Sequence, residues 1–294
     1  MPDVTTREVH AGSSGLPTML KAALPVLPGL NLVPGIAKKG GALPDLTLTR
    51  TDLPVDAGHV AAYAELCGFP SRQQLPLTYP HLLAFSLQMG IMTDGSFPFP
   101  AIGTVHLANS ITQHRPIGLG ERLSVSASAE HLRVHPKGKL FDLVTTVTAD
   151  GETVWESTSE YLRVGKGDRA VVAERDPLDV VPAGPVAWRL PGDLGRRYAA
   201  VSGDRNPIHL YPLTAKAFGF PRQIAHGMWT KARCVAALDN RLPDAVTVLV
   251  ENKLPVFLPG SVAFGSRISA GLVEFSLTRP NDGAPHLVGR ATPA

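Results

Sequence analysis

An aspartate and a histidine lie five positions apart in a short polar stretch of this 294-residue chain. Asp204 and His209 flank the break made by Asn206 and Pro207. An aspartate carboxylate can hold and polarise a water molecule or orient an imidazole, and a histidine that titrates near neutral pH can move a proton in either direction. The pair therefore predicts general acid–base chemistry.

A second polar turn lies downstream, at His226 and Gly227, where an apolar helical run begins. The first N–H groups of a helix have no intrahelical partner, and such donors stabilise negative charge that develops on a carbonyl oxygen. Gly227 is therefore predicted to hold an oxyanion such as a thioester enolate. His226 has two readings, a proton donor and a helix cap or buried structural histidine, and we favour the second.

Both stretches match a known signature. Residues 202–209 read Ser-Gly-Asp-Arg-Asn-Pro-Ile-His and residues 225–228 read Ala-His-Gly-Met. Together they resemble the MaoC-like (R)-specific enoyl-thioester hydratases, also called hydratase 2. In that family the aspartate and histidine of the first run are the catalytic pair, and the glycine of the second supplies the oxyanion N–H. The resemblance implies these roles for Asp204, His209 and Gly227, with supporting roles for Ser202, Asn206 and His226. On composition alone, Asn206 and Pro207 are also an ordinary turn and cap.

The resemblance implies a lyase without a cofactor. It would add water to a trans-2-enoyl thioester to give the (R)-3-hydroxyacyl thioester in fatty-acid metabolism, or remove it in reverse. Which of Asp204 and His209 delivers the α-proton stays open. Two alternatives are a thioesterase of the same fold and a non-catalytic subunit that only binds acyl thioesters. The intact pair argues against the second alternative.

The acyl carrier is expected to be coenzyme A or an acyl carrier protein, both of which present a phosphate. Arg205, Arg222 and Lys253 are candidate phosphate contacts because they lie near the signature or on the strand after its helix. Each also fits a solvated surface charge. No metal site is expected, since His131 and His135 lie on a predicted strand, where four residues span about 13 Å.

Composition narrows the class of protein. The chain has 28 basic and 25 acidic residues, a net charge of +3 and 44% hydrophobic residues, which predicts a globular protein without a nucleic acid partner. Asp3 and Glu8, with prolines beyond them, argue against a signal peptide or a membrane span in residues 1–41. Cys67 and Cys234 lie in apolar contexts and are predicted to be reduced, as in the cytoplasm.

The elements that position the site come in two sets. Residues 1–41 are predicted to be an arm, and residues 165–184, which lack an apolar period, a linker. Residues 42–164 and 185–294 each show a strand, a helix, a long buried helix and four strands. The predicted ranges are 46–51, 55–67, 79–92, 103–115, 121–134, 140–149 and 153–164, then 185–190, 193–202, 227–242, 245–254, 261–269, 271–279 and 285–292.

The second set repeats the first. Residues 63–68 match 198–203 without gaps, after which Phe69 stands where Asp204 stands, and 111–119 match 250–258. With the resemblance, this predicts an α+β double hotdog, in which two antiparallel sheets each wrap round a long central helix and join into one continuous sheet.

The first half is expected to be non-catalytic, because Phe69 replaces the aspartate, and the resemblance implies that this half shapes the acyl pocket. Its long helix, 79–92, meets a break at Asp94 and Gly95, whereas the second helix runs to Asn240. In related proteins a shorter helix in the inactive half opens room for longer acyl chains, so the resemblance implies medium or long acyl chains here. A homodimer is an arrangement that the sequence leaves open.

Overall fold

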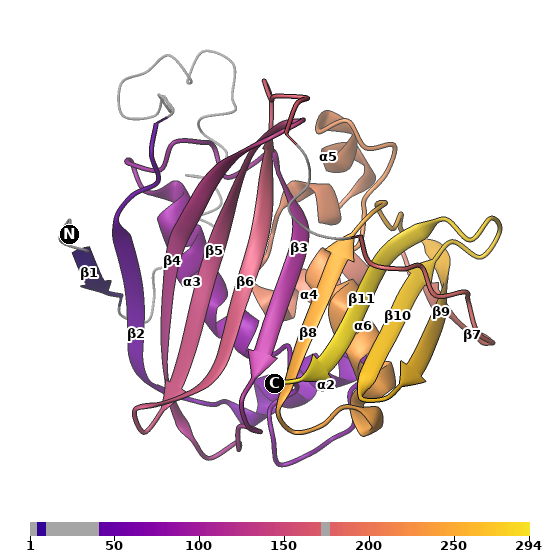
Figure 1. The fold of residues 1–294 in the computed structure, drawn as a ribbon, viewed down its shortest axis with the longest axis horizontal. Helices are drawn as coiled ribbons and strands as arrows, with labels where there is room; N and C mark the ends of the chain where they lie inside the picture. The colour runs from indigo at the N-terminus through magenta and orange to yellow at the C-terminus, as the bar shows by residue number, and fades with distance from the viewer. Residues whose placement is uncertain (1–4, 10–40, 172–176) are drawn as a thin grey trace.

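A computed structural model describes residues 5–9, 41–171 and 177–294, so most of the predicted arm lies outside the described residues. The described strands form one eleven-stranded sheet in the order β1-β2-β4-β5-β6-β3-β8-β11-β10-β9-β7 (Figure 1). At one edge, β1 (Thr5–Glu8) pairs in parallel with β2 (Leu46–Pro54). The predicted continuous sheet is confirmed.

The N-terminal half follows the predicted order closely. Asp56 caps α2 by accepting hydrogen bonds from the backbone N–H groups of Gly58 and His59, and the helix ends at Gly68, whose φ of 81° is left-handed. The α3 helix is buried because it is apolar on most faces, and it packs against β2, β4 and β5. The elements after β2 are α2 (Ala57–Cys67), α3 (Pro80–Thr93), β3 (Thr104–Gln113), β4 (Arg122–His135), β5 (Gly138–Ala149) and β6 (Glu152–Val164).

The C-terminal half repeats this plan with an insertion. Two short helices lie inside the stretch for which no element was predicted, η3 (Pro207–His209) and α5 (Pro212–Ala217). Each has a proline in its first turn, where the missing N–H costs nothing. The other elements are β7 (Val186–Leu190), α4 (Leu194–Ser202), α6 (Gly227–Leu238), η4 (Asp239–Arg241), β8 (Val246–Asn252), β9 (Gly260–Ser269), β10 (Leu272–Thr278) and β11 (Pro285–Pro293).

The repeat is visible in the backbone. Gly203 ends α4 with a φ of 77°, as Gly68 ends α2. Isolated bridges also recur at matching positions, Gln74 with Gly118 and Ile224 with Phe257. In Figure 1, α3 and α6 lie behind the sheet, one under each half. We keep the division into units 42–164 and 185–294, joined by 165–184, as a proposal.

The two halves meet where β3 and β8 pair antiparallel. We call this junction of β3 and β8 the seam. Lys231 of α6 lies fully buried beneath it. Its Nζ donates to Asn109 O at 3.0 Å, Asn109 Oδ1 at 2.5 Å and Val248 O at 2.9 Å, so it joins one helix to both seam strands. Burial lowers the pKa of Lys231 well below its usual value.

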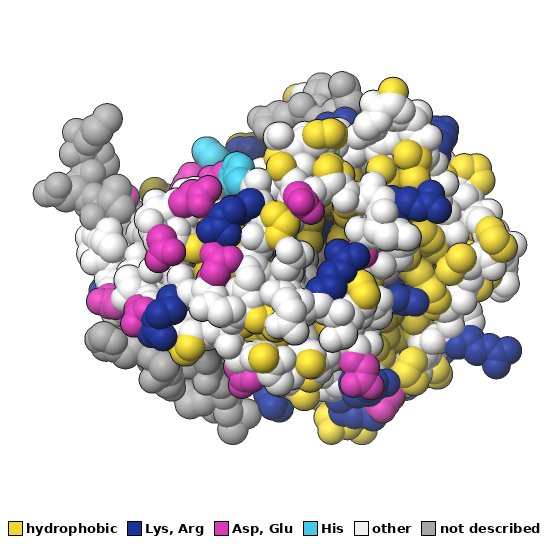
Figure 2. Space-filling view, turned by 90° about the horizontal axis from the view of Figure 1, so that it is seen from below, with side chains coloured by type: hydrophobic (Ala, Val, Ile, Leu, Met, Phe, Trp, Pro, Cys, Tyr) yellow, Lys and Arg dark blue, Asp and Glu magenta, His cyan; other side chains and the backbone are white. Residues whose placement is uncertain are grey.

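The outer surface of the molecule shows two further features. In the view from below, dark blue and magenta side chains are interspersed, and hydrophobic side chains are most frequent on the right (Figure 2). On the right in Figure 1 lies the β9–β7 end of the sheet, where Val186 and Ile268 are exposed. Within residues 5–9, 41–171 and 177–294, no helix has the length and hydropathy to cross a membrane.

Candidate active site

A cavity of about 460 Å³ lies between the two halves and collects the predicted site residues. Asp204, His209 and Gly227 all line it, as do the three supporting residues Ser202, Asn206 and His226. The rest of its wall includes residues from α3, the start of β3 and the end of β8. The C-terminal half thus supplies the predicted catalytic groups, and both halves supply the wall around them.

Asp204 is positioned by the turn after α4. Gly203 reverses the chain direction, and Ser202 Oγ accepts a hydrogen bond from Asp204 N at 3.2 Å. Asp204 Oδ1 accepts from Asn206 N at 3.1 Å, and the Asn206 side chain caps η3 by accepting from Ile208 N at 3.4 Å. The structural reading of Asn206 and Pro207 therefore fits the geometry, because their turn sets the path from Asp204 to His209.

His209 ends η3 and is buried. Its Nδ1 donates to Ile224 O at 2.8 Å, and because a carbonyl oxygen can only accept, Nε2 of the neutral ring keeps its lone pair. Burial lowers the pKa of His209, and the charge of Asp204 partly opposes that shift. The ring is therefore a proton acceptor at neutral pH.

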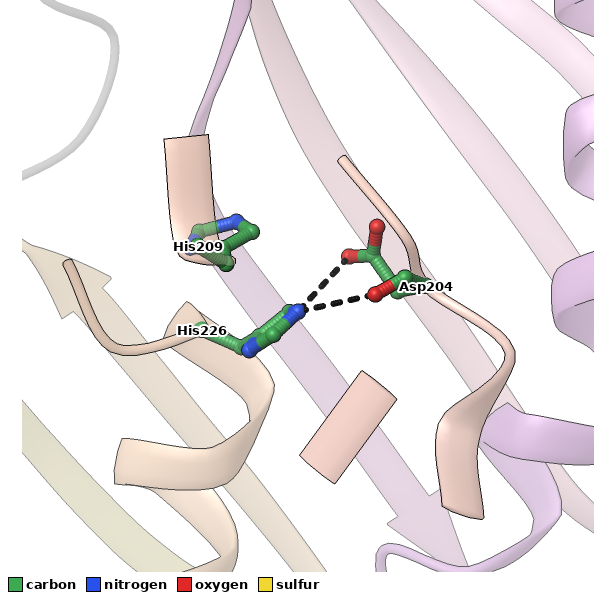
Figure 3. A group of neighbouring side chains, drawn as sticks. All are labelled: Asp204, His209 and His226. Atoms are coloured by element: carbon green, nitrogen blue, oxygen red, sulfur yellow. Dashed lines mark hydrogen bonds and ion pairs between the residues drawn. The ribbon is translucent and has the colours of Figure 1, made fainter. Parts of the chain in front are cut away.

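His226 packs on His209, with ring centroids 3.8 Å apart (Figure 3). Its Nε2 donates to Asp204 O at 3.0 Å and lies 3.9 Å from Asp204 Oδ2. Burial and the neighbouring His209 hold the pKa of His226 well below its usual value. A neutral histidine that is bonded to the backbone of Asp204 fits the predicted structural role, since it fixes the two catalytic candidates relative to each other.

Gly227 is the first residue of α6, and no side chain caps this helix. The N–H of Gly227 has no intrahelical partner and lies at the wall of the cavity. A Cβ at this position would lie 2.9 Å from Asn252 Nδ2, so a larger residue would displace that side chain. The site thus combines a carboxylate, an imidazole lone pair and a helix N-terminus.

Asp204, His209 and His226 each place one atom that can bind a metal within 4.8 Å of the others. The nitrogen of His226 nearest the aspartate carries a proton, because it donates to Asp204 O. An ion bound through this nitrogen would have to displace its proton and break that hydrogen bond. The arrangement as it stands fits acid–base chemistry better than metal ligation.

Sequence reasoning treated His81 and His106 of the first half as structural residues, and both line the cavity. Burial lowers the pKa of His81 to about 3 and that of His106 to about 4, so both rings are neutral. Tyr161 also lines the cavity, and burial together with the Asp204 charge raises its pKa. The repeat contained one signal: His81 lies in the first turn of α3, and His226 precedes α6.

The three candidate phosphate contacts differ in position. Lys253 lines the cavity and pairs with Glu251 at 2.5 Å. Arg222 is exposed and lies over the Phe257 ring, 5.7 Å from its centroid. Arg205 is exposed as well. The last two are thus accessible to a large acyl carrier.

The long helices of the two halves differ little in length, because the helical run that starts at Gly227 continues through η4 to Arg241. The α3 helix has 14 residues and α6 has 12, since α6 tightens into η4 after Leu238. The space available to an acyl chain is set by the side chains that line the cavity. Phe85, Met89 and Met92 of α3 and Ile102 line the cavity.

Comparisons with known proteins agree with this geometry. A sequence model of the MaoC like domain matches residues 179–281. The chain is 38% identical over 278 residues to 3-hydroxyacyl-thioester dehydratase X of Mycobacterium tuberculosis, covering 93% of this chain and 96% of that protein. The crystal structure of that organism's HtdX superposes with a TM-score of 0.75 and 38% identity, over 84% of this chain and 100% of the other. A MaoC-like dehydratase from Phytophthora capsici, at 20% identity, shares the fold with a TM-score of 0.67, over 84% of this chain and 95% of that one.

Proposed function

Since the chain belongs to the MaoC-like dehydratase family, we propose that it is a hydro-lyase that interconverts (R)-3-hydroxyacyl thioesters and trans-2-enoyl thioesters. Its relative in Mycobacterium tuberculosis is named a 3-hydroxyacyl-thioester dehydratase and matches nearly the whole chain. The observation that carries the proposal is the meeting of Asp204, His209 and the N-terminus of α6 at one cavity.

In the hydration direction, a water molecule lies between the Asp204 carboxylate and His209 Nε2. Its oxygen attacks the β-carbon of the enoyl thioester while Nε2 takes one of its protons. The electron pair of the double bond moves to the thioester oxygen, and the Gly227 N–H holds the resulting enolate. A proton from the pair then reaches the α-carbon and completes the addition. Dehydration is the same path in reverse, and no step uses a cofactor.

The acyl chain lies along α3. Beyond the catalytic pair, the cavity continues past Phe85 to Met89, Met92 and Ile102, which are all apolar. Flexible methionine side chains adapt to an alkyl chain. Medium or long acyl chains therefore fit this cavity better than four-carbon ones.

The carrier phosphate would meet the exposed basic residues beside α5. The sequence has no acidic residue between Asp204 and Asp239, and Arg205, Lys216 and Arg222 in this stretch are exposed. A region of one charge sign attracts either the phosphates of coenzyme A or an acidic carrier protein. For a homodimer, the exposed apolar side chains at the β9–β7 end of the sheet offer a contact surface. The free buried thiols Cys67 and Cys234 fit a cytoplasmic protein.

The test is a hydration assay with trans-2-enoyl-CoA that follows enoyl absorbance and thiol release together. We expect the absorbance to fall without free thiol, whereas release of thiol would support the thioesterase alternative. Asp204→Asn and His209→Gln should each lower the rate by about 10² to 10⁴. The controls are Asp150→Asn, at an exposed turn where φ is 49°, and His114→Gln, at an exposed position. Full activity in both site variants would contradict the assignment.

A further inference from the structure

We propose that Asn252 donates a second hydrogen bond to the enolate oxygen, beside the N–H of Gly227, and is a further catalytic residue. Asn252 is the last residue of β8 and lines the cavity. The inference rests on the proposed function, because it needs a thioester oxygen at the N-terminus of α6. Its own evidence is the placement of one amide group.

The Asn252 amide lies directly against the first residue of α6. A Cβ built on Gly227 would be 2.9 Å from Asn252 Nδ2 and 3.4 Å from Oδ1. Because Gly227 has no side chain, the Asn252 amide can lie where the first N–H groups of α6 face the cavity. A substrate oxygen bound at Gly227 N–H would lie near this amide.

The orientation of the amide follows from its one hydrogen bond. Asn252 Nδ2 donates to His106 O at 3.0 Å. Because a backbone carbonyl can only accept, the nitrogen and not the oxygen must face His106, which removes the usual ambiguity of an asparagine side chain. The nitrogen has a second hydrogen, and this one has no partner within the part of the chain that the structure describes. It is free to meet a bound oxyanion.

The bond to His106 also makes the donor rigid. It ties the end of β8 to β3, so the amide is held by both halves of the molecule before substrate binds. Donors that are already oriented stabilise developing charge without reorganisation during the reaction, which is why oxyanion holes combine backbone N–H groups with amide side chains. Asn252 and Gly227 form such a combination.

The repeat supplies an internal comparison. Gln113 occupies the position in β3 that Asn252 occupies in β8, and its Nε2 donates to Asp244 O at 2.9 Å. Gln113 thus ties β3 to the C-terminal half, and Asn252 ties β8 to the N-terminal half. Gln113 is buried and is not part of the cavity wall, whereas Asn252 is. Joining the halves accounts for both amides, but it does not account for the contact of Asn252 with Gly227.

This difference makes Gln113→Ala the matched control. We would measure kcat and KM for enoyl-CoA hydration, and the thermal unfolding midpoint, for Asn252→Ala, Asn252→Asp and Gln113→Ala. Asn252→Ala should lower kcat by about 10² to 10³, the usual loss for one oxyanion donor, with KM within a few-fold of wild type. Asn252→Asp keeps the shape and removes the donor, so it should lose at least as much. Gln113→Ala should lower the unfolding midpoint and leave kcat within about three-fold of wild type, since it is not at the reacting atoms.

Two results would overturn the inference. One is an Asn252→Asp enzyme that folds and keeps kcat within about three-fold of wild type. The other is an equal loss of kcat in Asn252→Ala and Gln113→Ala, which would mean that both amides act only through the seam. Failure of the proposed function is distinguishable, because then the wild-type protein itself would not hydrate enoyl-CoA. If Asn252→Ala does not fold, the isosteric Asn252→Asp decides the question.

Discussion

At the scale of single residues, burial decides which groups of the site can exchange protons. His209 and His226 are both buried and both have a pKa below the usual value for histidine. The Nε2 of His226 donates to the backbone oxygen of Asp204, whereas the Nδ1 of His209 donates to Ile224 O and its Nε2 is left for the site. Two stacked histidines therefore have different tasks because their hydrogen-bond partners differ.

The pH dependence of hydration tests this division. The pKa of His209 is lowered from 6.5, so its lone pair is lost only when the pH falls below that value. We expect kcat/KM to hold steady near neutral pH and to decline on an acid limb with a midpoint below 6.5. The charge of Asp204 raises the pKa of His209, so Asp204→Asn should move the residual activity's acid limb to still lower pH. The measurement is kcat/KM between pH 4.5 and 8, and an acid limb that moves upward in Asp204→Asn would contradict the assignment of His209 as base.

At the scale of elements, the long helices α3 and α6 contribute different kinds of residue to the cavity. The α6 helix presents Gly227 to the cavity, whereas α3 presents His81 at its start and Met89 and Met92 farther along. The residues of α3 thus form part of the cavity wall. Phe69 shows the same difference between the halves, since it is buried and stacks on Tyr63 where the other half exposes Asp204 to the cavity.

Filling the apolar end of the cavity should shorten the accepted acyl chain. Met89→Trp adds bulk at the apolar end of the cavity, and we expect eight-carbon and longer enoyl-CoA substrates to lose at least about ten-fold in kcat/KM. Crotonyl-CoA, which does not reach Met89, should lose less than about three-fold. Ser86→Trp on the same helix is the control, because Ser86 is partly buried and does not line the cavity. Equal losses for short and long substrates in Met89→Trp would mean that the acyl chain does not run along α3.

At the scale of the whole molecule, the two halves share one buried polar region. Lys231 bonds both seam strands, and His81 and His106 lie close enough to it that its charge lowers the pKa of each further. The two histidines are neutral in the folded protein and take up protons freely once it unfolds. The stability of the fold is therefore linked to pH through groups that line the active site.

Acidification should destabilise the folded protein. The pKa of His81 is about 3 when folded and near 6.5 when unfolded, so its contribution is complete above pH 6.5 and is lost as the pH falls towards 3. Each such histidine lowers the free energy of unfolding by up to about 1.4 kcal/mol per pH unit in that window. Urea unfolding at pH 7, 6 and 5 would measure the slope, which should become less steep in His81→Asn by about one proton. An unchanged slope in that variant would show that His81 is protonated or accessible in the folded state.

The sequence by itself determined the elements and the catalytic candidates. Helices and strands follow local periods, and glycines such as Gly68 end them, so both halves were predicted within a few residues. Asp204, His209 and Gly227 were found because two short signature runs contain them, and the continuous sheet was predicted from the repeat together with the family resemblance. The two short helices η3 and α5 were missed because each is a short turn that begins at a proline within a polar loop, and only η3 has a side-chain cap.

Only the tertiary structure decided which residues outside the signature reach the site. Asn252, His81 and Tyr161 reach the cavity because β3 and β8 pair across more than 130 positions of sequence, and no local period encodes that pairing. The same holds for the hydrogen bonds that assign Nε2 of His209 and Nε2 of His226 to different tasks. A motif can state which groups do the chemistry, but burial and partners from distant strands set their protonation and their aim.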